Sequence, residues 1–187
     1  MDDLFNEGFN AVFIGVGCAK GMKLGFPEDN EPIEGYSNGL DFLLQVERGV
    51  VEGEAPSFSG DFVVVGGGNV AMDVARSSVR LGADKVAVAY RRRKADMTAL
   101  PEEVESAMAE GVEIMELYAP ERIEADEDGQ VKTLWVSQQM PGEIRGGRPS
   151  PKAIGTDSIS VECDIVIAAV GQGIESRYFV EQGIDAK

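Results

Sequence analysis

Two neighbouring segments of the sequence have the residue types and the spacing to bind a phosphorylated ligand. The first segment contains six residues in a GxGxxA pattern: Gly66, Gly67, Gly68, Asn69, Val70 and Ala71. In dinucleotide-binding proteins, the glycines of this pattern allow a tight turn and a close approach of the backbone to a pyrophosphate, and the small third residue lets a helix pack against the preceding strand. A turn that serves only tight packing, and a site for S-adenosylmethionine or another adenosine ligand, remain alternatives.

The second segment is basic and follows Tyr90. It consists of Arg91, Arg92, Arg93 and Lys94. Proteins that bind NAD place an Asp or a Glu near this position, where it accepts hydrogen bonds from the ribose hydroxyls. Guanidinium groups instead bind phosphate in a bidentate manner, so the cluster favours binding of the 2′-phosphate of NADPH. The alternative is a solvated charge run that compensates nearby acids such as Asp84 and Asp96.

A third candidate segment closes an apolar run near the end of the sequence. It contains Ala169, Val170, Gly171 and Gln172. A glycine at the end of a strand lets a flat ring lie against the backbone, which suits a nicotinamide. An ordinary turn that ends a strand explains the same residues equally well.

The composition excludes several other kinds of chemistry. The 187 residues include no histidine, so we expect no histidine-based catalysis, no catalytic acid or base and no metal. The net charge of −16, from 17 Lys and Arg against 33 Asp and Glu, disfavours binding to nucleic acids and anionic membranes. Cys18 and Cys163 form no CxxC pair and are expected to be small buried hydrophobes. Because no membrane span or signal peptide is found, we expect a cytoplasmic protein.

The pattern of apolar residues predicts the elements that position these segments. Strands are expected at residues 62–65, 85–90, 112–117 and 164–170, with helices at 70–81 and 101–110. This alternation predicts parallel pairing with right-handed crossovers, which brings the carboxyl ends of the strands and the starts of the helices to one edge. The predicted fold class is α/β, a Rossmann-like doubly wound parallel sheet. A small antiparallel β annex is expected from residues 121–125, 131–139 and 159–163.

The remaining segments have weaker patterns. Residues 9–15 predict a buried strand, residues 20–37 a loop, and residues 38–48 a helix capped by Ser37. A stretch rich in glycine and proline, residues 142–156, predicts a further loop. The expected domains are a flanking segment at residues 1–57, an NADP(H)-binding domain at 58–173 and a return segment at 174–187.

The sequence resembles a known family in five stretches, which occur in the family's order. They are FNAVFIGVG (9–17), FVVVGGGNVAMDVARSSVRLGADKV (62–86), AYRRRKADMTALPEEVE (89–105), EGVEI (110–114) and CDIVIAAVGQG (163–173). The family is that of the small subunit of NADPH-dependent glutamate synthase. It includes the N-terminal half of dihydropyrimidine dehydrogenase and is related to the pyridine nucleotide-disulphide oxidoreductases. In that family, an NADPH-binding domain is inserted into a discontinuous FAD-binding domain.

The resemblance implies a role for each candidate segment. The implied contacts are Gly67–Val70 for the pyrophosphate of NADPH, Arg91 and Arg92 for its 2′-phosphate, and Ala169–Gly171 for the nicotinamide. Some relatives carry a basic residue where Thr98 stands, and we expect Arg93 to take over its contact. The chain would then deliver a hydride from NADPH to FAD in a flavin-dependent oxidoreductase.

The departures from the family pattern lead us to expect an NADPH domain from a longer flavoprotein. The glycine fingerprint for FAD, the later FAD-binding segment and the cysteine-rich region for iron–sulfur clusters are missing from this sequence. FAD would therefore be bound only in the parent protein, and the isolated chain would be inactive and could self-associate. Its partners would be the FAD-binding domain of the same parent chain and an iron–sulfur or catalytic partner subunit. The alternative is a regulatory module that senses a dinucleotide without a redox role.

Overall fold

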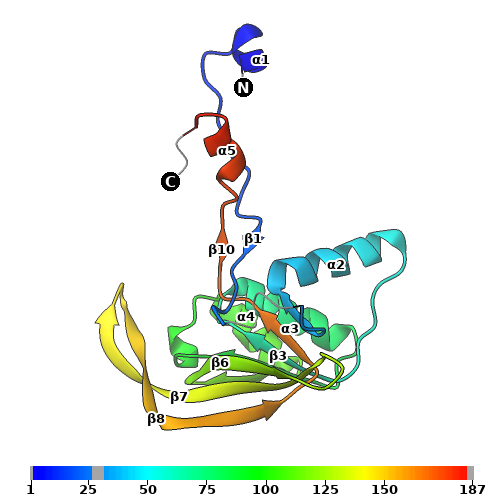
Figure 1. The fold of residues 1–187 in the computed structure, drawn as a ribbon, viewed down its shortest axis with the longest axis vertical. Helices are drawn as coiled ribbons and strands as arrows, with labels where there is room; N and C mark the ends of the chain where they lie inside the picture. Colours follow the sequence, from blue (N-terminus) through cyan, green and yellow to red (C-terminus); the bar gives the residue numbers. More distant parts are fainter. Residues whose placement is uncertain (1, 27–31, 185–187) are drawn as a thin grey trace.

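A five-stranded parallel sheet forms the centre of the fold (Figure 1). The computed structural model describes residues 2–26 and 32–184. The strands of this sheet are, in spatial order, β2 (Tyr36–Asn38), β9 (Ile165–Ala168), β3 (Asp61–Val65), β4 (Lys85–Tyr90) and β5 (Glu113–Glu116). Because β4 and β5 lie on one side of β3 while β9 and β2 lie on the other, the strand order reverses at β3.

The side chains of β3 alternate between the two faces of this sheet. Phe62 and Val64 pack into a core that helices cover, whereas Val63 and Val65 pack into a core that a second sheet covers. A strand with both faces buried reads as a continuous apolar run, as residues 62–65 do. The predicted strand and its parallel pairing are therefore confirmed.

Three helices cover one face of the sheet: α2 (Gly39–Glu52), α3 (Asn69–Arg80) and α4 (Pro101–Ala109). As predicted, α3 connects β3 to β4, and α4 connects β4 to β5. Phe42 of α2 joins the same core, where its ring stacks on Phe58 with the ring centroids 5.4 Å apart. The α2 N-cap is Asn38 and not the predicted Ser37, because Asn38 Oδ1 accepts hydrogen bonds from two amides of the first turn.

A three-stranded antiparallel sheet covers the other face. Its strands are β6 (Tyr118–Ala125), β7 (Val131–Arg145) and β8 (Arg148–Glu162). The turn between β6 and β7 is held by Asp126, whose Oδ1 accepts hydrogen bonds from the amides of Asp128 and Gln130. Helices on one face and antiparallel strands on the other confirm the predicted α/β, Rossmann-like fold with an antiparallel annex.

The hairpin of β7 and β8 is longer than predicted. The sequence predicts a loop at residues 142–156, but these residues extend both strands, and Arg145 pairs with Arg148 across the turn. Gly146 and Gly147 lie between the strands with φ angles of 58° and 79°. A two-residue turn with two positive φ angles has the twist that a β-hairpin needs. The loop prediction is therefore wrong, since the glycines form a turn.

Residues from both ends of the sequence form a stem that leads away from the two sheets (Figure 1). It contains α1 (Asp2–Asn6), α5 (Arg177–Glu181), and β1 (Lys20–Gly21) paired antiparallel with β10 (Gln172–Gly173). The predicted buried strand at residues 9–15 is wrong, because these residues form no strand and Phe13 is 95% exposed. An apolar run becomes a strand only where a neighbouring strand pairs with its backbone, and no described strand pairs with residues 9–15.

The part of the chain before β3 is more ordered than predicted. Two short strands, β1 and β2, interrupt residues 20–37, which the sequence predicts as a loop. The helix α2 continues to Glu52, beyond the predicted end at residue 48, and Gly53 caps it with a φ of 76°. No helix within residues 2–26 and 32–184 is long and apolar enough to cross a membrane. The domain boundaries, with the NADP(H)-binding domain at residues 58–173, stay a prediction.

Candidate functional site

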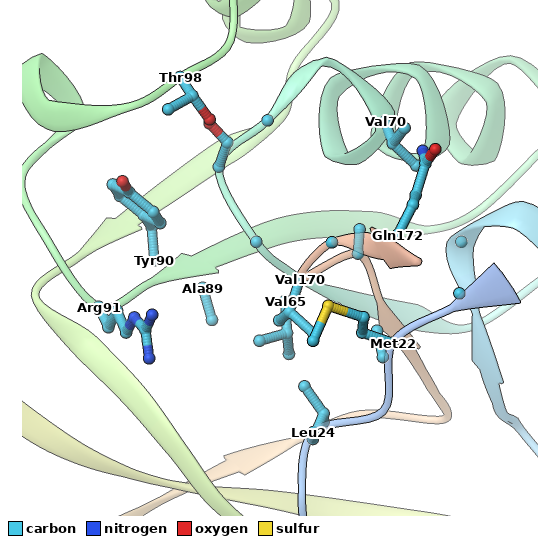
Figure 2. A pocket seen from close by; sticks show the side chains of 18 of the residues that line it. Met22, Leu24, Val65, Val70, Ala89, Tyr90, Arg91, Thr98, Val170 and Gln172 are labelled. Carbon is cyan, nitrogen blue, oxygen red and sulfur yellow. The ribbon is translucent and has the colours of Figure 1, made fainter. Parts of the chain in front are cut away.

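A cavity of about 830 Å³ opens at the carboxyl ends of β3, β4 and β9 (Figure 2). This is the edge at which the strand order reverses, where open parallel sheets bind ligands. The predicted site residues that line the cavity are Gly66, Gly67, Gly68, Asn69, Val70, Arg91, Arg92, Ala169, Val170, Gly171 and Gln172. The three candidate segments, which are far apart in the sequence, therefore meet around one cavity.

Gly66 joins the ends of the three strands. Its amide donates a hydrogen bond to the carbonyl oxygen of Ala89 in β4, with an N–O distance of 3.1 Å. Its φ angle of 149° is one that L-residues rarely adopt, and a Cβ at this position would collide with the carbonyl oxygen of Ala169, just after β9. Only glycine fits here, as the first position of the dinucleotide fingerprint requires.

The start of α3 supplies hydrogen-bond donors at the cavity. Gly68 is the N-cap residue of α3, and no side chain caps the helix there. The first amides of a helix have no acceptors within it, and the helix dipole favours an anion at this end. A Cβ at Gly68 would meet only Thr98 Oγ1, at 3.6 Å, so the space beside this backbone is open. Ala71 lies outside the described lining and is fully buried, which fits its expected role in helix packing.

The loop before α4 holds the glycine turn in place. The amides of Thr98 and Ala99 both donate hydrogen bonds to the carbonyl oxygen of Gly67, at 2.9 and 3.0 Å. The amide of Leu100 donates to Asn69 Oδ1 at 2.9 Å. The Asn69 side chain is therefore used to fix the loop, although Asn69 itself lines the cavity.

Basic residues line the cavity, and its described lining contains no acidic residue. The basic residues are Lys23, Arg91, Arg92 and Arg148. In a chain with a net charge of −16, such a lining is suited to an anionic ligand. Figure 2 shows Tyr90 and Arg91 on the opposite side of the cavity from Val70 and Gln172.

The predicted arginines differ in their contacts. Arg92 lines the cavity while its Nε donates a hydrogen bond to the carbonyl oxygen of Pro149, at 2.7 Å. Arg93 lies outside the described lining and forms a bidentate ion pair with Asp96, with N–O distances of 2.8 and 3.0 Å. This pair holds the pKa of the Asp96 carboxyl below its usual value. Arg91 and Arg92 are therefore better placed than Arg93 to contact a ligand in the cavity.

Apolar residues from the N-terminal part of the chain line another wall of the cavity. Met22 and Leu24 both contribute to it. The amide of Met22 donates a hydrogen bond to the carbonyl oxygen of Gly171 at 3.0 Å, and a Cβ on Gly171, which has a φ of 142°, would lie 3.0 Å from Met22 Sδ. The close approach at this strand end therefore needs glycine.

Sequence reasoning missed several lining residues, among them Met22, Lys23, Leu24 and Arg148. Met22 and Leu24 reach the cavity through the two-residue strand β1, and no pattern in the sequence indicates its pairing with β10. Arg148 reaches it through the β7–β8 hairpin, for which the Gly146–Gly147 pair was an available signal.

The two cysteines lie in different environments. Cys18 is exposed and lines the cavity, so the prediction that it is buried is wrong. Cys18 is exposed because it belongs to the stem, which leads away from the two hydrophobic cores. Cys163 is buried, as predicted, and this burial raises the pKa of its thiol to about 11. The described residues contain no cluster of side chains that could hold a metal ion.

Curated relatives share the sequence of this chain over most of its length. It is 37% identical over 182 residues to the beta subunit of an NADP(+)-dependent formate dehydrogenase from Moorella thermoacetica, covering 95% of this chain and 25% of that protein. It is 37% identical over 180 residues to the glutamate synthase (NADPH) small chain of Escherichia coli (strain K12), covering 91% of this chain and 37% of that protein. The chain thus spans well under half the length of these relatives.

Solved structures share the fold. FprA from Mycobacterium tuberculosis in complex with NADPH matches with a TM-score of 0.70 and 18% identity, over 92% of this chain and 52% of that one. A thioredoxin reductase from T. acidophilum matches with a TM-score of 0.62 and 16% identity, over 90% of this chain and 46% of that one. The family model "Pyridine nucleotide-disulphide oxidoreductase" matches residues 2–187. The predicted resemblance is confirmed, and the chain belongs to the pyridine nucleotide-disulphide oxidoreductase family.

Proposed function

We propose that this chain binds NADPH in the cavity and presents it to an FAD that other parts of the parent protein bind. One observation carries the proposal. A glycine turn, an uncapped helix and arginines that form no ion pair within the described residues surround one cavity, at the edge where the strand order of the parallel sheet reverses. Each of these features favours an anionic ligand that extends along the strand ends.

The described residues fit the parts of a nicotinamide dinucleotide. Gly67–Val70 would hold the pyrophosphate, because the space beside the Gly68 backbone is open and the helix start favours an anion. Arg91 and Arg92 would hold the 2′-phosphate. Ala169–Gly171 would lie along the nicotinamide, beside the apolar side chain of Met22.

The chemistry in this proposal comes from the cofactors and not from an acid or base of the chain. A bound NADPH would supply a hydride for an FAD held by other parts of the parent protein. The residues of this chain bind and orient the donor and exclude water from the cavity. The names of the relatives support the choice of cofactor, since those of the formate dehydrogenase beta subunit and of the glutamate synthase small chain include NADP(+) and NADPH.

The stem would face the FAD-binding domain of the parent chain. It exposes large apolar side chains, with Phe13 at 95%, Val16 at 64% and Tyr178 at 66% exposure. Several large exposed apolar side chains on one segment support an interface with another domain or subunit. The subunit names of the relatives also support a further partner subunit. We further propose that the parent protein is cytoplasmic.

Calorimetric titration of the purified 187-residue chain tests the proposal. We expect NADPH to bind at least about tenfold more tightly than NADH, because hydrogen bonds to charged groups contribute about 1.5–3 kcal/mol each. S-adenosylmethionine should not bind, and the purified chain should carry no flavin absorbance. Equal affinities for NADPH and NADH would overturn the assignment of the 2′-phosphate. A yellow chain with stoichiometric FAD would overturn the assignment of FAD to other parts of the parent protein.

A further inference from the structure

We propose that Arg148, the first residue of β8, is a third ligand of the 2′-phosphate and contributes to the choice of NADPH over NADH. The inference rests on the proposed function, because it concerns the same cavity. It extends the site from the parallel sheet, which carries Arg91 and Arg92 at the end of β4, to the antiparallel sheet that covers it.

Arg148 reaches the cavity because of the turn that precedes it. Gly146 and Gly147 reverse the chain within two residues, so β8 begins directly at Arg148. Arg148 is half-buried and lines the cavity. Arg145, its register partner across the turn, is exposed and pairs with Glu143 at 3.2 Å. The hairpin therefore carries two arginines of which one lines the cavity.

A hydrogen bond ties this hairpin to the basic segment after β4. Arg92 Nε donates to the carbonyl oxygen of Pro149 at 2.7 Å, and Pro149 is buried. Arg91, Arg92 and Pro149 also line a second, small hollow between the strand end and the hairpin, together with Asp96, which is paired with Arg93. Because Arg148 directly precedes Pro149, the hydrogen bond from Arg92 ties the backbone beside Arg148 to the segment that carries the two arginines we assign to the 2′-phosphate.

Within residues 2–26 and 32–184, no acid forms an ion pair with Arg91, Arg92 or Arg148. The arginines that do form ion pairs there are Arg76, Arg80, Arg93, Arg122 and Arg145. Like charges repel one another unless an anion joins them. A phosphate monoester carries a charge of about −1.5 to −2 at neutral pH and three acceptor oxygens, so guanidinium groups from two structural elements can bind it together.

The position of Arg148 favours the 2′-phosphate over the pyrophosphate. The glycine turn and the start of α3 already offer backbone donors for the pyrophosphate. Arg148 instead directly precedes Pro149, whose carbonyl oxygen accepts a hydrogen bond from Arg92, and Arg92 follows the strand whose end distinguishes NADP from NAD in this fold. We therefore expect its removal to weaken only ligands that carry a 2′-phosphate.

The test compares Arg148→Ala with Arg145→Ala in the 187-residue chain. Both variants remove one arginine from the same hairpin. Binding of NADPH, NADH, adenosine 2′,5′-bisphosphate and 5′-AMP is measured by calorimetry. Arg148→Ala should weaken NADPH and adenosine 2′,5′-bisphosphate about tenfold or more and change NADH and 5′-AMP by less than about twofold. Arg145→Ala should change all four by less than about twofold.

Arg148→Lys and Arg148→Gln separate charge from folding. Both retain a long side chain at the half-buried position, so they serve if Arg148→Ala does not fold. The lysine variant should bind adenosine 2′,5′-bisphosphate more tightly than the glutamine variant, because lysine keeps the charge although it lacks the planar fork. Equal affinity of these two variants for adenosine 2′,5′-bisphosphate would overturn the proposal.

Two further outcomes would also overturn it: an equal loss for ligands with and without the 2′-phosphate, or unchanged NADPH affinity in Arg148→Ala. Failure of the proposed function would give a different result. The unmodified chain would then itself bind NADPH no more tightly than NADH, or would bind neither. A chain that prefers NADPH but does not respond to any change at Arg148 would leave Arg91 and Arg92 as the ligands and remove Arg148 alone.

Discussion

The ring of Tyr90 occupies the space that a side chain at Gly67 would need. A Cβ at Gly67 would lie 2.5 Å from Tyr90 Cε2. The ring has little room to move, because Tyr90 is only 6% exposed and its hydroxyl donates a hydrogen bond to the carbonyl oxygen of Asp96 at 2.8 Å. Gly68, one residue later, has open space beside it instead. Both glycines line the cavity, but a side chain at Gly67 would collide with the Tyr90 ring, whereas one at Gly68 would enter open space.

This difference predicts different results for Gly67→Ala and Gly68→Ala. Gly67→Ala should lower the free energy of unfolding by about 1–3 kcal/mol, the range for adding a methyl group to a packed site. Gly68→Ala should leave it nearly unchanged, because its Cβ would meet only Thr98 Oγ1 at 3.6 Å. It should instead weaken NADPH binding, since the added methyl group would lie between the backbone and the pyrophosphate. Urea unfolding and calorimetric titration measure the two effects.

Tyr90→Phe provides the control for this pair. It keeps the ring against Gly67 and removes only the hydroxyl, so it should destabilise the fold by about 1 kcal/mol through the lost hydrogen bond to Asp96. If Gly67→Ala were as stable as the unmodified chain, the Tyr90 ring would not be fixed as described.

Arg91 and Arg92 should respond differently to substitution by alanine. Both variants should lose about 1.5–3 kcal/mol of NADPH affinity while binding NADH almost unchanged, because each removes one charge-assisted contact to the 2′-phosphate. Only Arg92→Ala should also lower the stability of the fold, since Arg92 Nε holds the hairpin at Pro149. Titration with both dinucleotides and thermal unfolding of each variant separate the two effects.

Arg177→Ala is the control for these variants, because it removes an exposed arginine in the stem, outside the described lining of the cavity. Its affinity for NADPH should stay within about twofold of the unmodified chain. Equal stability of Arg91→Ala and Arg92→Ala would show that the hydrogen bond to Pro149 contributes nothing to holding the hairpin.

The central part of the fold and most of the site could be predicted because their signals are local. The apolar run at residues 62–65, the glycine turn and the helical spacing after it lie next to one another in the sequence. Such an order fixes a parallel strand–helix–strand unit whose strand ends meet at one edge. Arg91 and Arg92 then follow from their place after β4, and the structure places both at the cavity.

The remaining parts of the site depend on contacts between distant residues. Met22 lines the cavity through the pairing of β1 with β10, and the sequence has no pattern for two-residue strands. The hairpin that carries Arg148 was missed because glycine and proline there suggest a loop, although two adjacent glycines also form the tightest hairpin turn. Residues 9–15 show the opposite case, since an apolar run predicts burial that the described structure does not supply.

The ion pair of Arg93 with Asp96 predicts an acid dependence of stability. The pKa of Asp96 is lower in the folded chain than in the unfolded chain, mainly because of its hydrogen bond to Arg93. Its contribution to stability is therefore present above the unfolded pKa of about 3.9 and is lost as the pH falls through the lower, folded pKa. Asp96→Asn should be less stable than the unmodified chain at neutral pH and should approach it in acid.

Urea unfolding between about pH 6 and about pH 2 measures this difference. Asp73→Asn is the control, because it removes an exposed carboxylate of α3 that forms no ion pair within the described residues. A constant stability difference between Asp96→Asn and the unmodified chain across the pH range would contradict the assignment of the pH dependence to this ion pair.

The two cysteines should react at very different rates with a thiol reagent. Thiolate is the reactive form, and burial raises the pKa of Cys163 to about 11 while also shielding its sulfur. Cys18 is exposed, so the folded chain should react quickly at one thiol and the unfolded chain at two. Because Cys18 lines the cavity, NADPH should slow its reaction in proportion to the fraction of chain that is bound. Absorbance of the released thiolate in an Ellman assay measures these rates.

Cys18→Ser assigns the fast reaction to Cys18. The folded variant should show no fast reaction, and the unfolded variant should react at one thiol. NADH at the same concentration should protect Cys18 less than NADPH, since the chain is expected to bind it more weakly. The dinucleotides should change the reaction rate of Cys163 only to the extent that they suppress global unfolding. Equal protection of both thiols by NADPH would mean that the ligand acts by stabilising the whole chain, and direct cover of Cys18 in the cavity would then be ruled out.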